Sequence, residues 1–328
     1  MIIYITTQGS RLSLDEGRVN ISQPEGMTRS IPKEQIESIS IFGKVQITSD
    51  VINHCLSRGI PINYFSGRGK YFGRTYTTSH SDIYRLKQQI KLSENEDFAL
   101  ELSKNIVSAK VNNQITLLRR YEKTRNNLTD IIKEMSIVSR KIKSANNLSE
   151  LRGFEGYIAR LYFGGISKCI NPIFEFKGRN RQPPKDPFNS LISLGYTILL
   201  NEIVGNLEAV GLNPFCGFLH EDRERHPTLA SDLIEEFRTP LVDSLALNLC
   251  NNKLKEEDFY KEDEAVFLEK ETLKIYLEEL ENKMNISQNY RQDDSPSTFR
   301  RTIGLQCRDL VRAIKEEDPS QYKPLWTR

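Results

Sequence analysis

The spacing of apolar residues changes near residue 80, and this change limits the folds open to the chain. Before it, short segments such as Ile36–Ile41 alternate apolar and polar side chains, which is typical of half-buried β-strands. From Tyr84 onward the apolar residues recur at helical spacing, and strand patterns are hard to find. We therefore predict an α+β fold in which a small β-rich part, residues 1–82, precedes a larger α-helical part, residues 83–328.

Turn residues divide the N-terminal part into short strands. Arg11–Leu14 and Arg18–Ile21 flank an Asp-Glu-Gly turn and predict a β-hairpin. Val51–Leu56 predicts a short helix, and Ile60–Phe65 predicts a further strand. The sequence contains neither a G-x-x-x-x-G-K-S/T nor a strand–G-x-G-x-x-G–helix phosphate-binding loop. Ser66–Gly69 is therefore interpreted as a basic hairpin tip.

Capping residues divide the helical part. Asn147 is a predicted N-cap for a helix over Leu148–Ile170. Asp186, followed by a proline, predicts the start of a helix over Phe188–Val210. Pro240 is expected to kink or interrupt the next helix. Further helices are predicted over Leu100–Leu118, Leu128–Ile142, Ala265–Met284 and Thr298–Glu316, and Lys253–Glu264 is expected to be acidic and exposed.

Composition and cysteine usage exclude several classes of protein. The chain has 328 residues, a formal net charge of +2 and five scattered cysteines, none of them in a C-x-x-C pair. An odd number of scattered thiols favours reduced cysteines in a cytosolic compartment over a disulfide framework or a zinc ribbon. No apolar run approaches the ~20 residues needed to cross a bilayer, and the N-terminus lacks the pattern of a signal peptide. We therefore expect a cytoplasmic protein without a membrane segment.

Charge is distributed unevenly along the chain. Residues 101–181 carry a local balance of +9, whereas residues 254–281 carry −7. Such asymmetry suggests a basic surface held apart from an acidic one, although charge runs are as often solvated helix faces. The helix over Leu100–Leu118 places its cationic residues, Lys110 among them, away from its apolar face. A Pro/Gly-rich loop later in the basic region suits phosphate contact or an exposed connector. Its cationic residues are Lys177, Arg179, Arg181 and Lys185.

Glu155 lies within the apolar stripe of the helix that follows Asn147. The other members of the stripe are Leu151, Ile158 and Tyr162. An ionised carboxylate in this position is costly unless it is paired with a cation or bound to a metal ion. A salt bridge to Arg152 or Arg160 at the edge of the stripe is the ordinary explanation, and a functional carboxylate is the alternative.

The stretch from residue 211 to residue 243 contains the other candidate ligands. His220 leaves an apolar turn, and the helix that follows carries Asp232 and Glu235 on its polar side. A histidine followed by carboxylates one helical turn apart can bind a divalent cation. A surface ion pair between Glu235 and Arg238 is the more frequent arrangement on spacing alone.

Several segments, taken in order, form a recognisable set. They are FGKVQIT (42–48), RGIPINYFSGRGKYFGR (58–74), GFEGYIARLYF (153–163), GLNPFCGFLHEDRERHPTLASDLIEEFR (211–238) and the late tyrosine Tyr322. Together they resemble the CRISPR-associated integrase family, the first of the numbered Cas proteins. The resemblance spans nearly the whole chain, and its most specific part is the Glu–His–acidic set in three local contexts. It favours a functional role for Glu155 and Glu235 over ordinary ion pairing.

The resemblance implies a small N-terminal β domain that forms a dimer interface and a larger helical catalytic domain. The family's metal ligands are a glutamate in a G-x-E-G helix, the histidine of G-F-L-H and an acidic residue in D-L-x-E-E-F-R. These match Glu155, His220 and Glu235, and some family members have aspartate at the third position. Asp232 matches a frequent second carboxylate that ligates the metal or orients a ligand. Two carboxylates and one imidazole suit Mg²⁺ or Mn²⁺.

The same resemblance implies a CRISPR adaptation integrase. In that family the 3′-hydroxyl of a short DNA fragment attacks a phosphodiester at the leader–repeat boundary, whereas water as the attacker would make the site a nuclease. The implied partners are double-stranded DNA, a second copy of the chain and the second numbered Cas protein. The alternatives are a structure-selective nuclease of branched DNA and a non-catalytic architectural DNA-binding subunit. Predicted phosphate contacts are Arg223, Arg225, Arg238 and the cationic loop, and His226 is interpreted as solvated or as a DNA contact.

Overall fold

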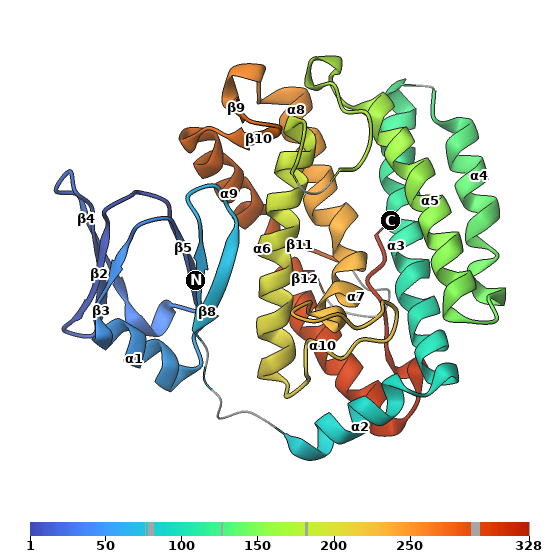
Figure 1. Cartoon of the computed structure of the whole chain (residues 1–328), viewed down its shortest axis with the longest axis horizontal. Coiled ribbons are helices and arrows are strands. Elements are labelled where there is room, and N and C mark those ends of the chain that lie inside the picture. The colour runs from blue at the N-terminus through green and yellow to red at the C-terminus, as the bar shows by residue number, and fades with distance from the viewer. Residues whose placement is uncertain (76, 78–81, 126, 181–182, 290–295, 328) are drawn as a thin grey trace. The chain divides into compact units, whose positions relative to one another are not determined.

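The chain divides into two compact units, Met1–His80 and Ser81–Arg328 (Figure 1). The first is built mainly from strands and the second mainly from helices, which confirms the predicted α+β class. The computed structural model describes residues 1–75, 77, 82–125, 127–180, 183–289 and 296–327.

The N-terminal unit contains two four-stranded sheets, with strand orders β1-β5-β7-β8 and β4-β3-β2-β6. The predicted hairpin is formed by β2 and β3, with Leu12 opposite Ile21. Strands β1, β5 and β7 are parallel, and β8 is antiparallel to β7. The elements are β1 (Ile2–Ile5), β2 (Arg11–Asp15), β3 (Arg18–Ser22), β4 (Thr28–Pro32), β5 (Ser38–Phe42), β6 (Gln46–Ile47), α1 (Ser49–Arg58), β7 (Ile62–Phe65) and β8 (Tyr71–Thr75).

Apolar side chains of both sheets and of α1 share one core. Leu12, Val19 and Ile39 are fully buried in it, and Val51 joins them from α1. The alternation of apolar and polar residues in the sequence therefore marks the buried face of each strand correctly. The loop from Ser66 to Lys70 joins β7 to β8 as a hairpin tip, as predicted, because the Ser66 amide donates to the Lys70 carbonyl at 2.7 Å.

The C-terminal unit contains the long helices. They are α2 (Ile83–Ser93), α3 (Glu96–Arg125), α4 (Thr129–Ser139), α5 (Leu148–Cys169), α6 (Pro187–Ala209), α7 (Thr228–Phe237), α8 (Ser244–Asn252), α9 (Lys270–Met284) and α10 (Phe299–Glu316). Two predicted N-caps are confirmed: the side chain of Asn147 accepts from the Glu150 amide at 2.9 Å, and that of Asp186 accepts from the Asn189 amide at 2.8 Å.

One predicted helix begins later than the sequence suggests. Residues assigned to an acidic loop and to the start of that helix instead form a hairpin of β9 (Phe259–Glu262) and β10 (Ala265–Leu268). The Val266 amide donates to the Pro184 carbonyl at 2.8 Å, so the hairpin is held by the loop before α6. Apolar residues in succession fit a strand that packs on another element, and this contact overrides the helical pattern. A second short pair, β11 (Ser287–Gln288) with β12 (Ser297–Thr298), precedes α10.

Helix α6 lies in the interior of the C-terminal unit. By length and mean hydropathy alone it could cross a membrane, but 67% of its apolar window is buried inside the protein. Its apolar character is therefore accounted for by packing, since it contacts α7, α8, α10 and β10.

Three helices approach one another at the centre of this unit. Helix α3 packs against α5 and also against α7 (Figure 1). After α7 the chain continues through a π-helical segment, Arg238–Asp243, into α8. Pro240 explains this local widening, because proline cannot donate the hydrogen bond of a regular α-helical turn. Segments of this kind are common at functional sites.

Candidate functional site

Glu155 and Glu235 are brought together by a lysine from a third helix. The ammonium of Lys110, on α3, lies 2.6 Å from Glu235 Oε2 on α7 and also pairs with Glu155 Oε1 on α5. The Lys110 and Glu235 side chains are only 10% and 6% exposed, so these charges are largely removed from water. The buried ammonium donates a hydrogen bond to Glu155 and forms an ion pair with Glu235, whose Oε2 accepts no hydrogen bond from the described residues. Neither Arg152, which pairs with Glu221, nor Arg160 takes this role for Glu155.

The burial of Lys110 differs from what the sequence pattern of α3 predicts. The helical pattern put this lysine with the solvated cationic residues, but it is buried and points into the site. Burial would lower the pKa of Lys110, but the charges of Glu235 and Glu155 raise it above its ordinary value. The lysine therefore stays protonated at neutral pH.

Glu235 has a second cationic partner. Arg238 Nε lies 3.2 Å from Glu235 Oε1, so the expected i, i+3 ion pair is present, but it is not on the surface, since the Glu235 side chain is only 6% exposed. Burial would raise the pKa of Glu235, but the charges of Arg238, Lys110 and His220 lower it to about 2. The carboxylate is therefore ionised at every physiological pH.

His220 is fixed by Asp232, which is fully buried. The Asp232 carboxylate accepts from the backbone amides of Phe218 at 2.7 Å, Leu219 at 3.0 Å and His220 at 3.1 Å. Its Oδ1 also lies 2.7 Å from His220 Nδ1. Because a carboxylate only accepts, Nδ1 carries a proton in this contact, and the neutral ring leaves Nε2 as a lone-pair donor.

The electrostatics of His220 follow from the same contact. Burial would lower the pKa of His220, but the hydrogen bond and charge of Asp232 raise it.

Gly217 allows the loop that carries His220 to approach α7. A Cβ atom at that position would lie 2.5 Å from Thr228 Cγ2 and 2.9 Å from Asp232 Oδ2, distances that real Cβ atoms do not adopt.

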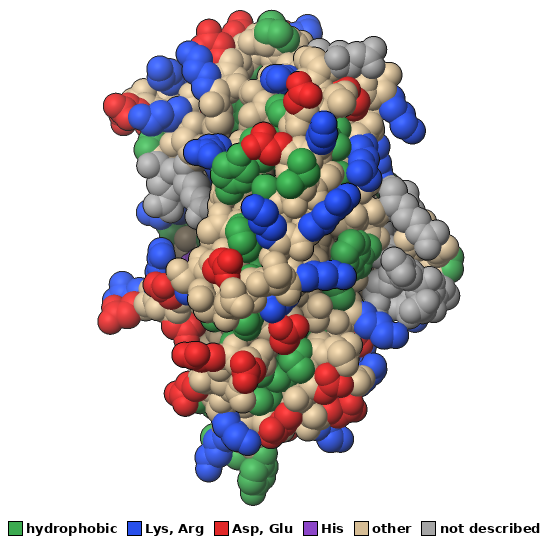
Figure 2. Space-filling view, turned by 90° about the vertical axis from the view of Figure 1, so that its right-hand side faces the viewer, with side chains coloured by type: hydrophobic (Ala, Val, Ile, Leu, Met, Phe, Trp, Pro, Cys, Tyr) green, Lys and Arg blue, Asp and Glu red, His purple; other side chains and the backbone are tan. Residues whose placement is uncertain are grey.

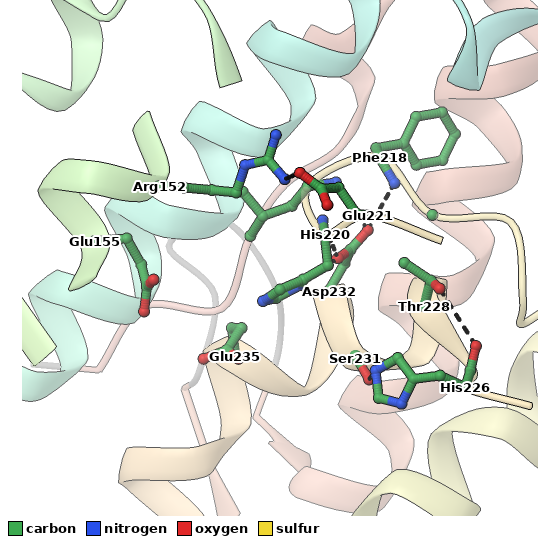
Figure 3. A network of polar contacts seen from close by, with 12 residues as sticks. Arg152, Glu155, Phe218, His220, Glu221, His226, Thr228, Ser231, Asp232 and Glu235 are labelled. Carbon is green, nitrogen blue, oxygen red and sulfur yellow. Dashed lines mark hydrogen bonds and ion pairs between the residues drawn. The ribbon is translucent and has the colours of Figure 1, made fainter. Parts of the chain in front are cut away.

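The close-up in Figure 3 shows Glu155, His220 and Glu235 directed toward one region from three segments of the chain. Within the described residues, no three His, Cys, Asp or Glu side chains are gathered as a ready-made metal site. The ammonium of Lys110 lies between the two glutamates instead. The donor chemistry nevertheless suits a hard divalent cation. The site already holds the positive charge of Lys110 between two carboxylates, and His220 directs only its Nδ1 at Asp232.

Comparison with known proteins assigns the family. The family model described as CRISPR associated protein Cas1 matches residues 3–282. The chain belongs to the Cas1 family.

Individual relatives agree with this assignment. A CRISPR-associated endonuclease Cas1 of Mycobacterium tuberculosis is 34% identical over 97% of this chain and 95% of its own length. A Cas6-RT-Cas1–Cas2 complex contains a chain that is 25% identical, with a TM-score of 0.84 over 99% of this chain, which spans 36% of that longer one. A Cas1 protein from Thermotoga maritima has the same fold, with 24% identity and a TM-score of 0.82 over 96% of this chain and 97% of that chain. The resemblance found in the sequence is thereby confirmed.

Two buried tyrosines, Tyr162 and Tyr196, form a polar network beside Arg238. Sequence reasoning placed Tyr162 in an apolar stripe and gave neither tyrosine a role at the site. Arg238 lies over the ring of Tyr196, 4.3 Å from its centroid, and the hydroxyl of Tyr196 donates to Asp243. Tyr162 donates to the other oxygen of Asp243 at 2.7 Å. Burial raises the pKa of Asp243 and outweighs these hydrogen bonds. No local pattern marks this network, because its members come from α5, α6 and the π-helical segment.

The predicted phosphate contacts fall into two groups. Arg238 and Arg179 are turned inward: Arg238 pairs with Glu235, and Arg179 donates to Asn189 Oδ1 at 2.8 Å. Lys177, Arg223 and Arg225 are exposed, as is Lys185, which pairs with Glu264 at 3.0 Å. Arg181 lies outside the described residues. His226 is half-buried, with Nε2 3.0 Å from Ser231 Oγ. Figure 2 shows further Lys and Arg side chains spread over the middle and upper part of the face that it presents.

Proposed function

We propose that this Cas1-family chain is a CRISPR adaptation integrase that joins the 3′-hydroxyl of short DNA fragments to a phosphodiester of the repeat array. The observation that best supports this proposal is that Glu155, Glu235 and His220 converge on one region. Asp232 holds His220 in the tautomer that leaves the Nε2 lone pair available. Phosphodiester transesterification needs a group that stabilises negative charge on the phosphate and activates a hydroxyl.

Mg²⁺ or Mn²⁺ is the proposed cofactor, held by Glu155, Glu235 and His220 Nε2. When bound, such an ion polarises the phosphate and lowers the pKa of the attacking hydroxyl or water. Lys110 holds the two glutamate side chains close together without the ion, because its ammonium contacts both. Arg238 fixes the other oxygen of Glu235 at 3.2 Å.

Asp232 is proposed to orient His220 rather than to bind metal. Its Oδ2 accepts from two backbone amides, and its Oδ1 accepts from one amide and contacts His220 Nδ1. The four contacts leave this buried carboxylate little capacity for an ion. A histidine ligand whose other nitrogen donates to a carboxylate is a recurring arrangement that fixes ring orientation.

The proposed partners are double-stranded DNA, the Cas2 protein and a second copy of the chain. The similarity to the Cas1-containing chain of a Cas1–Cas2 complex supports the second of these. We assign the dimer interface to the N-terminal unit and a cytoplasmic location to the complex. Lys177, Lys185, Arg223 and Arg225 are proposed phosphate contacts, because exposed cations neutralise backbone phosphates at little cost in desolvation. Arg181, which lies outside the described residues, is proposed from the sequence alone.

An integration assay tests the proposal. The purified protein, with its partner, is incubated with short duplexes bearing 3′-hydroxyl ends, a supercoiled plasmid carrying the array, and Mn²⁺ or Mg²⁺. Joining is expected for the wild type and is expected to fall at least about 100-fold in Glu155→Ala and His220→Ala. Arg160→Ala, on the same helix as Glu155, serves as the control. Full joining by either site variant would overturn the assignment.

A nuclease acting on branched DNA is the second candidate, since the relatives are named endonucleases. It predicts cleavage of junctions whose 3′ ends are blocked, whereas the integrase needs a free 3′-hydroxyl. Dideoxy-terminated substrates therefore separate the two activities.

A further inference from the structure

The last residues of the chain run along α3. Asn105 on α3 donates to the Pro319 carbonyl at 3.3 Å, and Asn112 donates to the Thr327 carbonyl at 3.2 Å. Figure 1 shows this red terminal segment beside α3. We call residues 318–327 the C-terminal strap. Apart from the short 3-10 helix Pro319–Gln321, the strap is irregular, so its contacts with α3 near both of its ends call for a physical explanation.

The strap is anchored on Glu236, a fully buried carboxyl group. The hydroxyl of Tyr322 donates to Glu236 Oε1, and the backbone amide of Leu325 donates to Oε2 at 2.7 Å. Gln306 from α10 donates to the same Oε2 at 2.7 Å. Tyr322 and Leu325 are themselves 2% and 0% exposed, so these bonds lie in the interior, where losing one is costly.

Asn113 on α3 connects the strap to both α3 and α7. Its Nδ2 donates to the backbone carbonyl of Glu236 at 2.9 Å and to that of Leu325 at 3.1 Å. Its Oδ1 accepts from the Thr327 amide at 2.8 Å. One buried amide on α3 therefore fixes α7 and the strap together.

These anchors are immediate neighbours of the candidate site. Glu236 follows Glu235 on α7, and Asn113 lies one helical turn after Lys110 on α3. Successive helical residues point about 100° apart, so Glu235 faces the site while Glu236 faces the strap. The strap thus fixes the rotation of α7 and its register against α3, where Lys110 Nζ lies 2.6 Å from Glu235 Oε2.

We propose that the C-terminal strap is a positioning element of the site: Tyr322 and Leu325 act through Glu236 to set the direction of the Glu235 carboxylate. This rests on the proposed function, because Glu235 is there a ligand of the divalent ion. It also gives a role to the late tyrosine, which the catalytic residues leave unexplained. Mutation of a group that orients a metal ligand typically lowers metal affinity by about 10–100-fold.

Mn²⁺ affinity of the full-length protein without DNA provides the test. Free Mn²⁺ is measured by electron paramagnetic resonance during titration of the wild type, Tyr322→Phe and Asn113→Ala. Both variants are expected to bind Mn²⁺ at least about 10-fold more weakly. Leu273→Ala, a truncation of a buried residue on α9 outside this network, is the control: it lowers the melting temperature and leaves Mn²⁺ affinity unchanged.

The only tryptophan of the chain, Trp326, lies in the strap and reports its docking directly. Binding linkage requires that Mg²⁺ stabilise the docked strap if the strap stabilises the metal site. Saturating Mg²⁺ is therefore expected to move the urea midpoint of Trp326 fluorescence upward in the wild type, and less so in Tyr322→Phe.

The outcomes separate the two proposals. A wild type that binds no Mn²⁺ refutes the metal site and the strap's role with it. A wild type that binds Mn²⁺, with unchanged affinity in Tyr322→Phe, refutes the strap alone. If Asn113→Ala does not fold, Tyr322→Phe decides the result, because it removes one hydroxyl and keeps the ring.

Discussion

Replacing Lys110 by methionine removes the cation from the centre of the site while keeping a side chain of similar length. In the wild type this ammonium pairs with Glu155 and lies 2.6 Å from Glu235. The Lys110→Met variant leaves Arg238 as the paired cation of Glu235 and leaves Glu155 without this partner. Uncompensated buried charge is among the few causes of a large loss of stability from one substitution.

The size of the effect follows from the pKa of Glu235. Its lowering from 4.5 to about 2 is the joint effect of burial, Arg238, Lys110 and His220. A shift of this size corresponds to roughly 3 kcal/mol of folding stability at neutral pH. Since Glu155 loses its partner as well, Lys110→Met is expected to lower the free energy of unfolding by about 2–4 kcal/mol. The melting temperature is expected to fall by roughly 5–15 °C.

Urea denaturation at several pH values, without divalent ions, measures this loss. Because the folded pKa of Glu235 is depressed, its stabilisation is complete above pH 4.5 and is lost as the pH falls toward about 2. The difference between Lys110→Met and the wild type is therefore expected to be full at pH 7 and to shrink through this window. Lys104→Met is the matched control on the same helix: Lys104 pairs with exposed Glu101, and its loss should cost at most about 0.5 kcal/mol. Equal stability of Lys110→Met and the wild type at pH 7 would refute the reasoning.

Three further predictions concern other parts of the C-terminal unit. Asp232→Asn is expected to weaken Mn²⁺ binding by about 10–100-fold, as measured by titration, because an amide nitrogen must face backbone N–H donors or His220 Nδ1–H; unchanged affinity would contradict the orienting role. Burial lowers the pKa of Lys283 from 10.5 to about 8, so wild-type stability should rise as the pH increases from 8 toward 10.5. Lys283→Met should remove this rise and raise the free energy of unfolding at pH 7 by about 1–3 kcal/mol in urea denaturation. A variant that keeps the rise would argue against a partly buried charge at Lys283. Gly217→Ala is expected to lower the melting temperature, because its Cβ would lie 2.5 Å from Thr228 Cγ2. Adding Thr228→Ser, which removes that methyl group, should restore part of the loss, and no recovery would show that the contact is not the cause.

Local patterns were sufficient for much of the fold. The change of apolar period near residue 80 predicts strands before helices, and the caps at Asn147 and Asp186 predict where α5 and α6 begin. These features depend on neighbours within a few residues, which the sequence displays directly. The hairpin of β9 and β10 was missed because it is held by the loop before α6 and by Ser190 of α6, more than 70 residues away in the chain.

The candidate site was likewise predicted in part. The sequence indicates that a carboxylate interrupts an apolar stripe at Glu155, and that His220 and Glu235 lie in segments that resemble the CRISPR-associated integrase family. Helical periodicity assigns a residue to a face of its helix, but it does not say which other helix packs against that face. The packing of the helices shows that Lys110 is the partner of both glutamates, and that Asp232 selects the tautomer of His220. These contacts join distant segments, and the burial that makes them strong exists only once α3, α5 and α7 have packed together.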